Sequence, residues 1–319
     1  MIICIYNPWS LYKELISMYI KMISIGTDCS GIEAPLQALK SLKIPYIQKW
    51  ACEIDKYSRL SSEANYKNPE KIYTDMLTRD NSLLPNVDLY VCGFPCQSFS
   101  NMGNRLGTLD PRSKIIPKMI DTIKHSKPKI CILENVRGFI SIEDGKPCKM
   151  LLEELEKLEY NVIHSIYNTK DYGIPQNRER VYFVCIRKGV QKKVYSKPKK
   201  TKMKSFESIL EDTSVHKQEI PLMYRNNNIN FEKDGYTIVN NNYNKLQFMR
   251  NISPTLTTTA KYYILELNRN LTLKEALRLQ GFPSSFKIVV SNNQLMKQIG
   301  NSMSVNVLKK ILQEAIKCI

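Results

Sequence analysis

Short apolar runs alternate with segments of helical spacing through roughly the first 190 residues of the chain. The first run leads into a turn at 28–31, and the apolar residues beyond it are spaced as on one face of a helix, at Ile32, Leu36, Leu39 and Leu42. Further apolar runs stand at 46–52, 87–92 and 130–133, with a helical pattern at 115–125. Strands that alternate with helices predict an α/β fold with a mostly parallel sheet.

Polar residues or sharp turns follow these runs, where the predicted strands end. Acids at 53 and 55 close the second run, a Pro-Cys turn closes the third, and a Glu-Asn pair closes the fourth. Ligands of open parallel sheets bind at the carboxyl ends of the strands. The pattern therefore predicts a ligand site along this edge of the sheet.

The pattern changes after two more predicted strands, at 161–168 and 180–187. Eight lysines lie between Lys188 and Lys204, and a weakly patterned, Asn-rich stretch covers 226–244. Helical periodicity then returns at 266–281, with Thr272 as the predicted cap, and again at 301–317. We therefore divide the chain into an N-terminal extension (1–21), a main domain (22–187), a small domain (188–265) and a return segment that completes the main domain (266–319).

The composition points to a polyanionic partner. Lys and Arg total 47 against 30 Asp and Glu, which gives a net charge of +17 and favours nucleic acid. A coding bias toward lysine is the alternative explanation of this charge. Nine cysteines without a CxxC pair predict a reducing, intracellular environment and no metal site. Polar and charged residues interrupt 1–21, so we expect neither a membrane span nor a signal peptide.

One cysteine stands where a nucleophile is useful. Cys96 directly follows Pro95 at the end of an apolar run, which holds it rigidly at the predicted ligand edge. A thiol attacks only as thiolate, so it needs positive charge or a helix N-terminus nearby. Taken alone, a cysteine at such a position is more often a small buried apolar residue than a nucleophile. Glu134 and the arginines of the segment 176–180 supply an acid and fixed positive charge at other predicted strand ends.

These segments together resemble the cytosine-5 DNA methyltransferase family. Its signatures are Pro-Cys-Gln, Glu-Asn-Val, Gln-x-Arg-x-Arg and Gly-Asn-Ser, and all four occur here in the family's order, at 95–97, 134–136, 176–180 and 300–302. The resemblance covers 22–187 and about 250–319. It implies a Rossmann-like methyltransferase fold with a small target-recognition domain at 188–265. It also implies S-adenosylmethionine as cofactor, no metal, and double-stranded DNA as partner, with a monomer as our expectation.

The resemblance assigns a mechanism to the four catalytic candidates. Cys96 would add to carbon 6 of cytosine, and Glu134 would hydrogen-bond to or protonate N3, so that carbon 5 can accept a methyl group. Arg178 and Arg180 would supply positive charge beside the thiolate and the base O2. Salt bridges are the alternative explanation of these charged residues.

The cofactor site is implied in the same way. The loop after the first strand departs from the family's Phe-x-Gly-x-Gly, because it reads Cys-Ser-Gly-Ile-Glu at 29–33. Glu53 fits an acid that accepts from both ribose hydroxyls, Ile54 would lie against the adenine, and Asp75 would accept from the adenine amino group. Acids at strand ends are alternatively helix caps. The remaining predicted cofactor residues are Cys29, Gly31, Ile32, Met76, Pro95, Asn301 and Ser302.

DNA contacts are expected around the target base, which must leave the duplex to be reached. The polar loop at 98–113 contains Ser98, Arg105 and Arg112, and the arginines are expected to contact phosphates when the loop closes. Arg250 precedes a Ser-Pro-Thr-Leu-Thr segment that resembles the family's link between the domains. An ordinary exposed loop and a solvated lysine-rich linker are the alternatives.

Three other functions compete with DNA methylation. One branch of this fold methylates a tRNA cytosine, but its Cys-Phe-Thr signature is absent from the sequence. A catalytically silent, DNA-binding relative is favoured only by the altered cofactor loop. A nicotinamide oxidoreductase is least favoured, because no complete GxGxxG follows a predicted strand.

Overall fold

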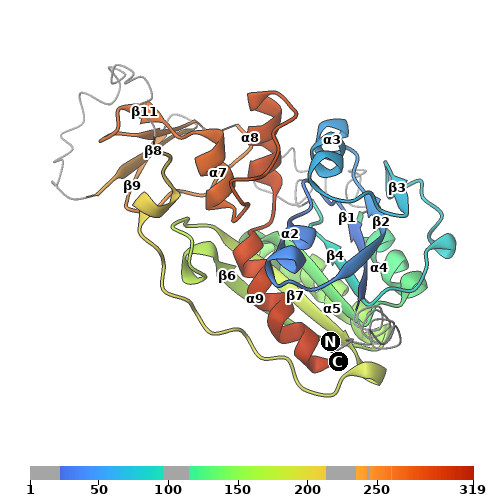
Figure 1. Ribbon diagram of the computed structural model, residues 1–319. Coiled ribbons are helices and arrows are strands. Elements are labelled where there is room, and N and C mark those ends of the chain that lie inside the picture. The colour runs from blue at the N-terminus through green and yellow to red at the C-terminus, as the bar shows by residue number, and fades with distance from the viewer. Residues whose placement is uncertain (1–21, 96–114, 213–234, 243–244, 260) are drawn as a thin grey trace, which may run out of the picture.

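The computed structural model describes residues 22–95, 115–212, 235–242, 245–259 and 261–319, and Figure 1 shows how their elements are arranged. The larger unit is a seven-stranded sheet of order β3-β2-β1-β4-β5-β7-β6. Its strands are β1 (Ile23–Asp28), β2 (Tyr46–Cys52), β3 (Lys71–Tyr73), β4 (Leu89–Cys92), β5 (Ile130–Val136), β6 (Tyr160–Asn168) and β7 (Glu179–Arg187). The helices are α2 (Ala34–Ser41), α3 (Lys56–Asn65), α4 (Ile115–Ser126), α5 (Lys146–Lys157), α7 (Leu273–Leu279), α8 (Asn292–Asn301) and α9 (Val305–Ala315). The predicted extension at 1–21 lies outside the described residues.

Strand β7 is the exception in an otherwise parallel sheet. Neighbouring strands pair in parallel from β3 to β5, whereas β7 runs antiparallel to both β5 and β6. The predicted α/β fold with a mostly parallel sheet is therefore confirmed. Because β7 is reversed, its amino end lies at the same edge as the carboxyl ends of the parallel strands, with Arg180 opposite Val136.

Helices cover both faces of this sheet, and the strands are apolar on both sides as a result. Alternate residues of a strand point to opposite faces. Ile130 and Ile132 of β5 join the hydrophobic cluster that contains α2 and α9, whereas Cys131 and Leu133 join the cluster that contains α4 and α5. This two-sided burial explains why the strands read as continuous apolar runs in the sequence.

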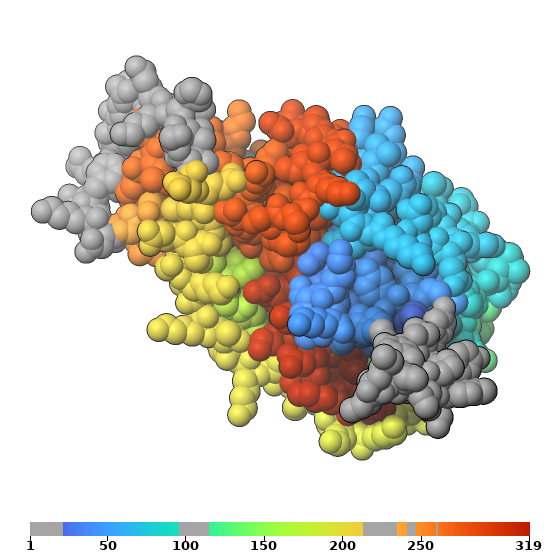
Figure 2. Space-filling view, viewed as in Figure 1, coloured from blue at the N-terminus to red at the C-terminus, as the bar shows by residue number. Residues whose placement is uncertain are grey.

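The C-terminal part of the chain returns to the first sheet. Helix α9 packs against α2, and in Figure 2 the red C-terminal surface lies directly against the blue surface of the N-terminal part. Leu308, Ile311 and Leu312 form the buried stripe of α9, at the spacing of one helix face. The last helix is thus part of the same core as the first strands.

A four-stranded antiparallel sheet of order β11-β10-β8-β9 forms a smaller unit. Its strands are β8 (Thr237–Asn242), β9 (Lys245–Arg250), β10 (Tyr262–Ile264) and β11 (Arg269–Asn270). The sheet lies within the predicted small domain except for β11, which belongs to the predicted return segment. The exact domain boundaries at 188 and 265 stay predictions.

The lysine-rich segment between the two units lies along the first sheet and α9. The Lys192 amide donates to the Cys318 carbonyl at 2.7 Å, and Lys197 Nζ donates to the Ile166 carbonyl at 2.8 Å. Tyr195 is buried in the main core. All eight lysines are exposed, so these contacts support the alternative in which the lysines belong to a solvated linker, whose main chain here packs on the core.

The helix predicted at 266–281 is shorter in the structure. Thr272 is its N-cap as predicted, because Oγ1 accepts from the Glu275 amide at 3.1 Å and the Glu275 carboxylate accepts from the Thr272 amide at 2.9 Å. Helical structure covers 273–279, while 269–270 pair with β10 instead. None of the helices in the described part of the chain is long and apolar enough to span a membrane.

Candidate active site

The carboxyl ends of β1, β2 and β3 bring three of the predicted cofactor segments to one edge. The three strands are neighbours and run in parallel. Cys29 and Gly31 follow β1, Glu53 follows β2, and Asp75 follows β3. Their meeting is therefore a consequence of strand order, and it forms the kind of edge at which α/β sheets bind ligands.

The Glu53 carboxylate links two of these loops. Oε2 accepts from the Gly31 amide at 2.7 Å, and Oε1 accepts from the Asp55 amide at 2.9 Å. Burial raises the pKa of Glu53 above its ordinary value, and the two amide donors oppose this shift. A carboxylate oxygen accepts up to two hydrogen bonds, so with the partners found among the described residues one position remains on each oxygen for a ligand.

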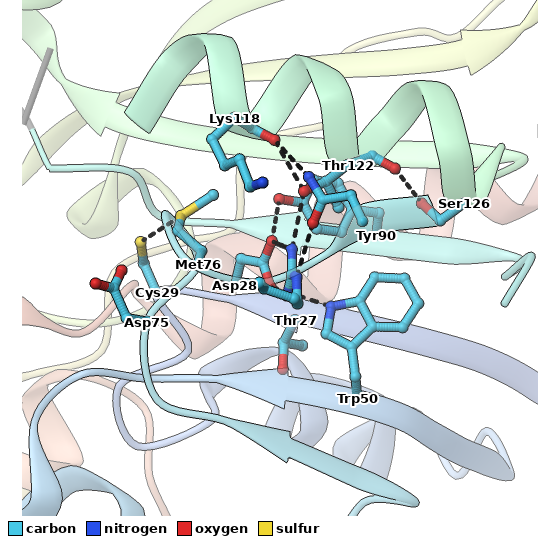
Figure 3. A network of polar contacts seen from close by, with 12 residues as sticks. Thr27, Asp28, Cys29, Trp50, Asp75, Met76, Tyr90, Lys118, Thr122 and Ser126 are labelled. Atoms are coloured by element: carbon cyan, nitrogen blue, oxygen red, sulfur yellow. Dashed lines mark hydrogen bonds and ion pairs between the residues drawn. The ribbon is translucent and has the colours of Figure 1, made fainter. Parts of the chain in front are cut away.

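The side chains near Glu53 offer an apolar platform and a second acid. Ile54 is 75% exposed although it follows a buried strand. Asp75 Oδ1 accepts from the Leu77 amide at 2.8 Å. Cys29 Sγ lies 3.9 Å from Met76 Sδ, and Figure 3 shows both beside Asp75. The loops after β1 and β3 are thus in direct contact.

Ile32 does not contribute its side chain to this edge. It is 0% exposed and belongs to the hydrophobic cluster that contains α2 and α9. Positive φ angles at Gly31 (54°) and Glu33 (57°) turn the chain sharply from β1 toward α2, which places Ile32 in the core. The burial of Ile32 leaves only its main chain available to a cofactor, and its assignment to the cofactor site stays a prediction.

Glu33 is a buried carboxylate behind the same loop. It is 1% exposed, and its Oε1 accepts from Thr27 Oγ1 at 2.8 Å and from Gln48 Nε2 at 2.7 Å. Its Oε2 has no hydrogen-bond partner among the described residues. Burial raises the pKa of Glu33 to about 7, and the nearby Glu53 carboxylate adds to the shift.

Glu33→Gln is expected to raise the free energy of unfolding by about 1–3 kcal/mol at pH 8 and to change it little near pH 4.5. The folded pKa of about 7 lies above the ordinary value of 4.5, so the wild type loses stability as the pH rises between these values. Urea unfolding at several pH values measures the effect. Glu70→Gln is the control, because Glu70 is an exposed partner of Lys49. An equal effect of Glu33→Gln at both pH values would contradict the prediction.

The turn after β4 is held against the end of β5. Asn135 Nδ2 donates to the Phe94 carbonyl at 3.1 Å. A Cβ atom at position 93 would lie 3.7 Å from Glu134 Oε2 and 2.7 Å from Met303 Cε, so Gly93 permits this close packing. The segment that leads to Pro95 and the predicted nucleophile therefore lies beside Glu134.

The surroundings of Glu134 favour the protonated form of its carboxyl group. It is 8% exposed, and its Oε1 lies 3.4 Å from Arg180 Nε. Within the described part of the chain this oxygen makes no hydrogen bond. Burial raises the pKa of Glu134, while the charges of Arg180 and Arg178 oppose the shift. Such a carboxyl can donate a hydrogen bond or a proton to a polar ligand.

The two arginines of the predicted catalytic set differ in their surroundings. Arg180 lies beside Glu134, as described above. Arg178 is 2% exposed. Its guanidinium donates to three main-chain carbonyls, those of Leu256 (2.9 Å), Gly300 (3.1 Å) and Ser302 (2.8 Å). Arg178 therefore joins β7 to the small unit and to the end of α8, and this engagement does not favour the predicted direct contact with a base.

Asn301 and Ser302, both predicted to contact the cofactor, stand at the end of α8. Asn301 is exposed, whereas Ser302 is buried and its Oγ donates to the Met303 carbonyl at 3.1 Å. A Cβ at Gly300 would lie 2.5 Å from the Thr257 carbonyl carbon. Glycine is thus required where α8 meets the segment between β9 and β10.

Arg250, predicted to bind DNA, is engaged within the small unit. Its Nη1 donates to Thr237 Oγ1 at 2.9 Å and pairs with the Glu266 carboxylate. Glu266 offsets the positive charge, so the geometry does not favour phosphate binding by Arg250.

Four other predicted residues lie outside the described residues, namely Cys96, Ser98, Arg105 and Arg112. The described part of the chain ends at Pro95 before them and resumes at Ile115 after them. Their roles stay predictions.

A buried polar cluster beneath the cofactor loops was missed by the sequence analysis. Asp28 was assigned to a turn, but it is the last residue of β1 and is 0% exposed. Its carboxylate pairs with Arg79 at 2.7 Å, with both side chains fully buried. The available signal was an acid that ends an apolar run, because buried acids are almost always paired. Nothing in the local pattern identifies the partner.

Comparisons with known proteins agree over nearly the whole chain. A family model described as C-5 cytosine-specific DNA methylase matches residues 20–317. The type II methyltransferase M.HaeII of Haemophilus aegyptius is 32% identical over 303 residues, with 91% of each chain covered. M.HhaI of Haemophilus parahaemolyticus is 29% identical, with 92% of this chain and 93% of the relative covered.

Solved structures show the same fold. The Dnmt2 methyltransferase of S. pombe superposes with a TM-score of 0.71 at 20% identity, over 92% of this chain and 98% of that one. A putative DNA modification methyltransferase encoded within an E. coli prophage gives 0.70 at 17% identity, over 93% and 99%. At these identities the likeness concerns the fold alone, and the match to the family model carries the assignment. The chain therefore belongs to the C-5 cytosine-specific DNA methylase family.

Proposed function

We propose that the chain transfers a methyl group from S-adenosylmethionine to carbon 5 of cytosine in double-stranded DNA, inside the cell. Family membership supports the reaction class. The observation that carries the mechanism is the setting of Glu134, a buried carboxyl beside Arg180 with one oxygen free of hydrogen bonds among the described residues. Glu134 adjoins the turn at 93–95, and Cys96 is the next residue in the chain.

The residues after β1, β2 and β3 fit S-adenosylmethionine, which supplies an electrophilic methyl group when bound. Glu53 has an acceptor position left on each oxygen for the two ribose hydroxyls. Ile54 offers its exposed side chain to the adenine, and Asp75 accepts from the adenine amino group. Asn301 and Pro95 complete the site by resemblance to the family.

Glu53→Ala is expected to weaken S-adenosylmethionine binding by roughly 1–3 kcal/mol, since hydrogen bonds between a charged group and the ribose are lost. Removal of the carboxylate also releases the Gly31 amide from its acceptor. Isothermal titration calorimetry measures the change. Glu70→Ala, which removes an exposed carboxylate paired with Lys49, is the matched control. Equal affinities of Glu53→Ala and the wild type would exclude Glu53 from the cofactor site.

The cytosine reacts in three steps. The Cys96 thiolate bonds to carbon 6, the double bond between carbons 5 and 6 opens, and Glu134 gives its proton to N3 as electron density reaches that atom. Carbon 5 then bonds to the methyl carbon as the methyl–sulfur bond of the donor breaks, and the bonding electrons stay on sulfur, which leaves as a neutral thioether. Loss of the carbon 5 proton to a base restores the double bond, expels the Cys96 thiolate, and returns the N3 proton to Glu134. Arg180 stabilises the negative charge that builds up beside Glu134, and Arg178 positions the start of β7.

The base must leave the duplex before it can reach this site. We assign the phosphate contacts to Ser98, Arg105 and Arg112, in the polar segment after Cys96. Recognition of the DNA sequence is assigned to the region 188–265, which contains most of the second sheet.

Bisulfite sequencing of DNA from a host that expresses the chain tests the proposal. We expect new 5-methylcytosine in one sequence context, and none with the empty vector. A purified-protein assay that compares duplex DNA with tRNA distinguishes the substrates. Methylation of tRNA alone would overturn the DNA substrate, and the absence of S-adenosylmethionine binding would favour a catalytically silent relative.

A further inference from the structure

A buried guanidinium lies between two of the loops assigned to the cofactor. Arg79 belongs to the same connection after β3 as Asp75, and its side chain is 0% exposed. Its Nη1 and Nη2 donate to Asp28 Oδ1 and Oδ2, both at 2.7 Å. Asp28 directly precedes Cys29 at the end of β1. One bidentate ion pair therefore joins the loop after β1 to the loop after β3.

The Asp28 carboxylate is also fixed from the two strands that flank β1. Besides Arg79, it accepts from Trp50 Nε1 at 3.0 Å and from Tyr90 Oη at 2.9 Å. Trp50 lies on β2 and Tyr90 on β4, on either side of β1, and Figure 3 shows both side chains around Asp28. A carboxylate has about four acceptor positions. Those of Asp28 are thus filled, and the carboxylate has little freedom to move.

The other donors of Arg79 reach α4. Nη2 also donates to Thr122 Oγ1 at 2.9 Å, and Nε donates to Asn81 Oδ1 at 2.8 Å. Asn81 Nδ2 in turn donates to Asp121 Oδ2 at 2.8 Å, so both routes end on the same helix. A planar guanidinium held in this way cannot rotate without breaking several charge-assisted hydrogen bonds.

A buried ion pair adds little net stability as a rule, because desolvation of two charges offsets their attraction. The ion pair nevertheless restricts the relative movement of the groups that it joins. Here it joins the two loops that also meet through Cys29 Sγ and Met76 Sδ. We propose that Arg79 is a positioning residue for the methyl donor. Through its pair with Asp28, Arg79 holds the Asp75–Met76 segment at a fixed place relative to the Cys29–Gly31 loop. The proposal rests on the proposed cofactor site.

Arg79→Lys is the test variant, because lysine keeps the positive charge but loses the planar bidentate donor. Arg269→Lys is the matched control, since Arg269 forms a second buried bidentate pair, with Glu275 at 2.8 and 2.6 Å, in the small unit. Both variants are expected to lower the unfolding temperature. Arg79→Lys is expected to raise the Kd for S-adenosylmethionine about tenfold or more, and Arg269→Lys by less than about twofold.

The outcomes separate this proposal from the proposed function. A wild type that does not bind S-adenosylmethionine overturns both. Binding by the wild type and equally tight binding by folded Arg79→Lys overturn the role of Arg79 alone, as does an equal loss of affinity in Arg269→Lys.

If Arg79→Lys does not fold, a milder variant tests the same proposal. Thr122→Val removes one acceptor of Arg79 and leaves its pair with Asp28 in place. We expect its Kd for S-adenosylmethionine to rise about threefold. An unchanged Kd would overturn the proposal.

Discussion

Replacing Cys96 by serine is expected to lower kcat for DNA methylation by about 10⁴-fold or more, the order of loss seen when a covalent nucleophile is removed. A serine hydroxyl ionises far less readily than a thiol, so nothing adds to carbon 6 and carbon 5 stays unreactive. The Kd for S-adenosylmethionine is expected to change by less than about twofold, because Glu53 and Asp75, the residues proposed to bind the cofactor, follow other strands. Transfer of a labelled methyl group and calorimetry measure the two quantities.

Two further measurements make the Cys96 result specific. Cys148→Ser changes a buried cysteine on α5 to which no part in the reaction is assigned, and is expected to keep the wild-type rate. Duplex DNA with 5-fluorocytosine at the target should trap a covalent complex at Cys96, because carbon 5 then lacks the proton that must leave. An active enzyme that forms no such complex, or a Cys96→Ser variant with substantial turnover, would contradict the covalent mechanism.

Glu134→Gln is expected to lower kcat by roughly 10²- to 10⁴-fold, the usual contribution of a positioned acid. Glutamine can hydrogen-bond to N3 but cannot transfer a proton to it. Because burial raises the pKa of Glu134, its protonated form persists to higher pH than for an exposed carboxyl. The rate of the wild type should therefore fall as the pH rises through this pKa, and the same decline should be missing in Glu134→Gln.

Glu179→Gln is the matched control for Glu134. Glu179 stands between the two arginines of the same segment but pairs with the exposed Arg137. Its substitution is expected to leave kcat and the pH profile almost unchanged. If Glu134→Gln kept a rate within about tenfold of the wild type, Glu134 would not be the acid of the reaction.

The sequence predicted the fold well because the strands are buried on both faces. Such strands appear as apolar runs, and alternation with helices follows directly from the pattern. The cap at Thr272 was also predicted correctly, since capping depends on residues close in the sequence. The helix predicted at 266–281 was too long at its start, because 269–270 pair with a strand whose position the local pattern does not reveal.

The candidate site was predicted less completely than the fold. The family signatures identified Glu134 and the arginine segment, yet they did not distinguish Arg180 from Arg178. The two arginines stand two residues apart on one extended segment, and their surroundings differ because three carbonyls from distant parts of the chain accept from Arg178. The burial of the Ile32 side chain was not apparent from the sequence for a similar reason, since it depends on α2 and α9.

By itself, the sequence determined the apolar strands, their α/β order and the residue types at their ends, because periodicity and short motifs are local properties. Only the tertiary structure decided which of those ends meet. The reversed direction of β7 brings Arg180 to Glu134, and the neighbouring positions of β1 and the loop after β3 pair Asp28 with Arg79. Both pairings follow from strand order, strand direction and the need of buried charges for partners, and none of these is encoded in a local stretch of sequence.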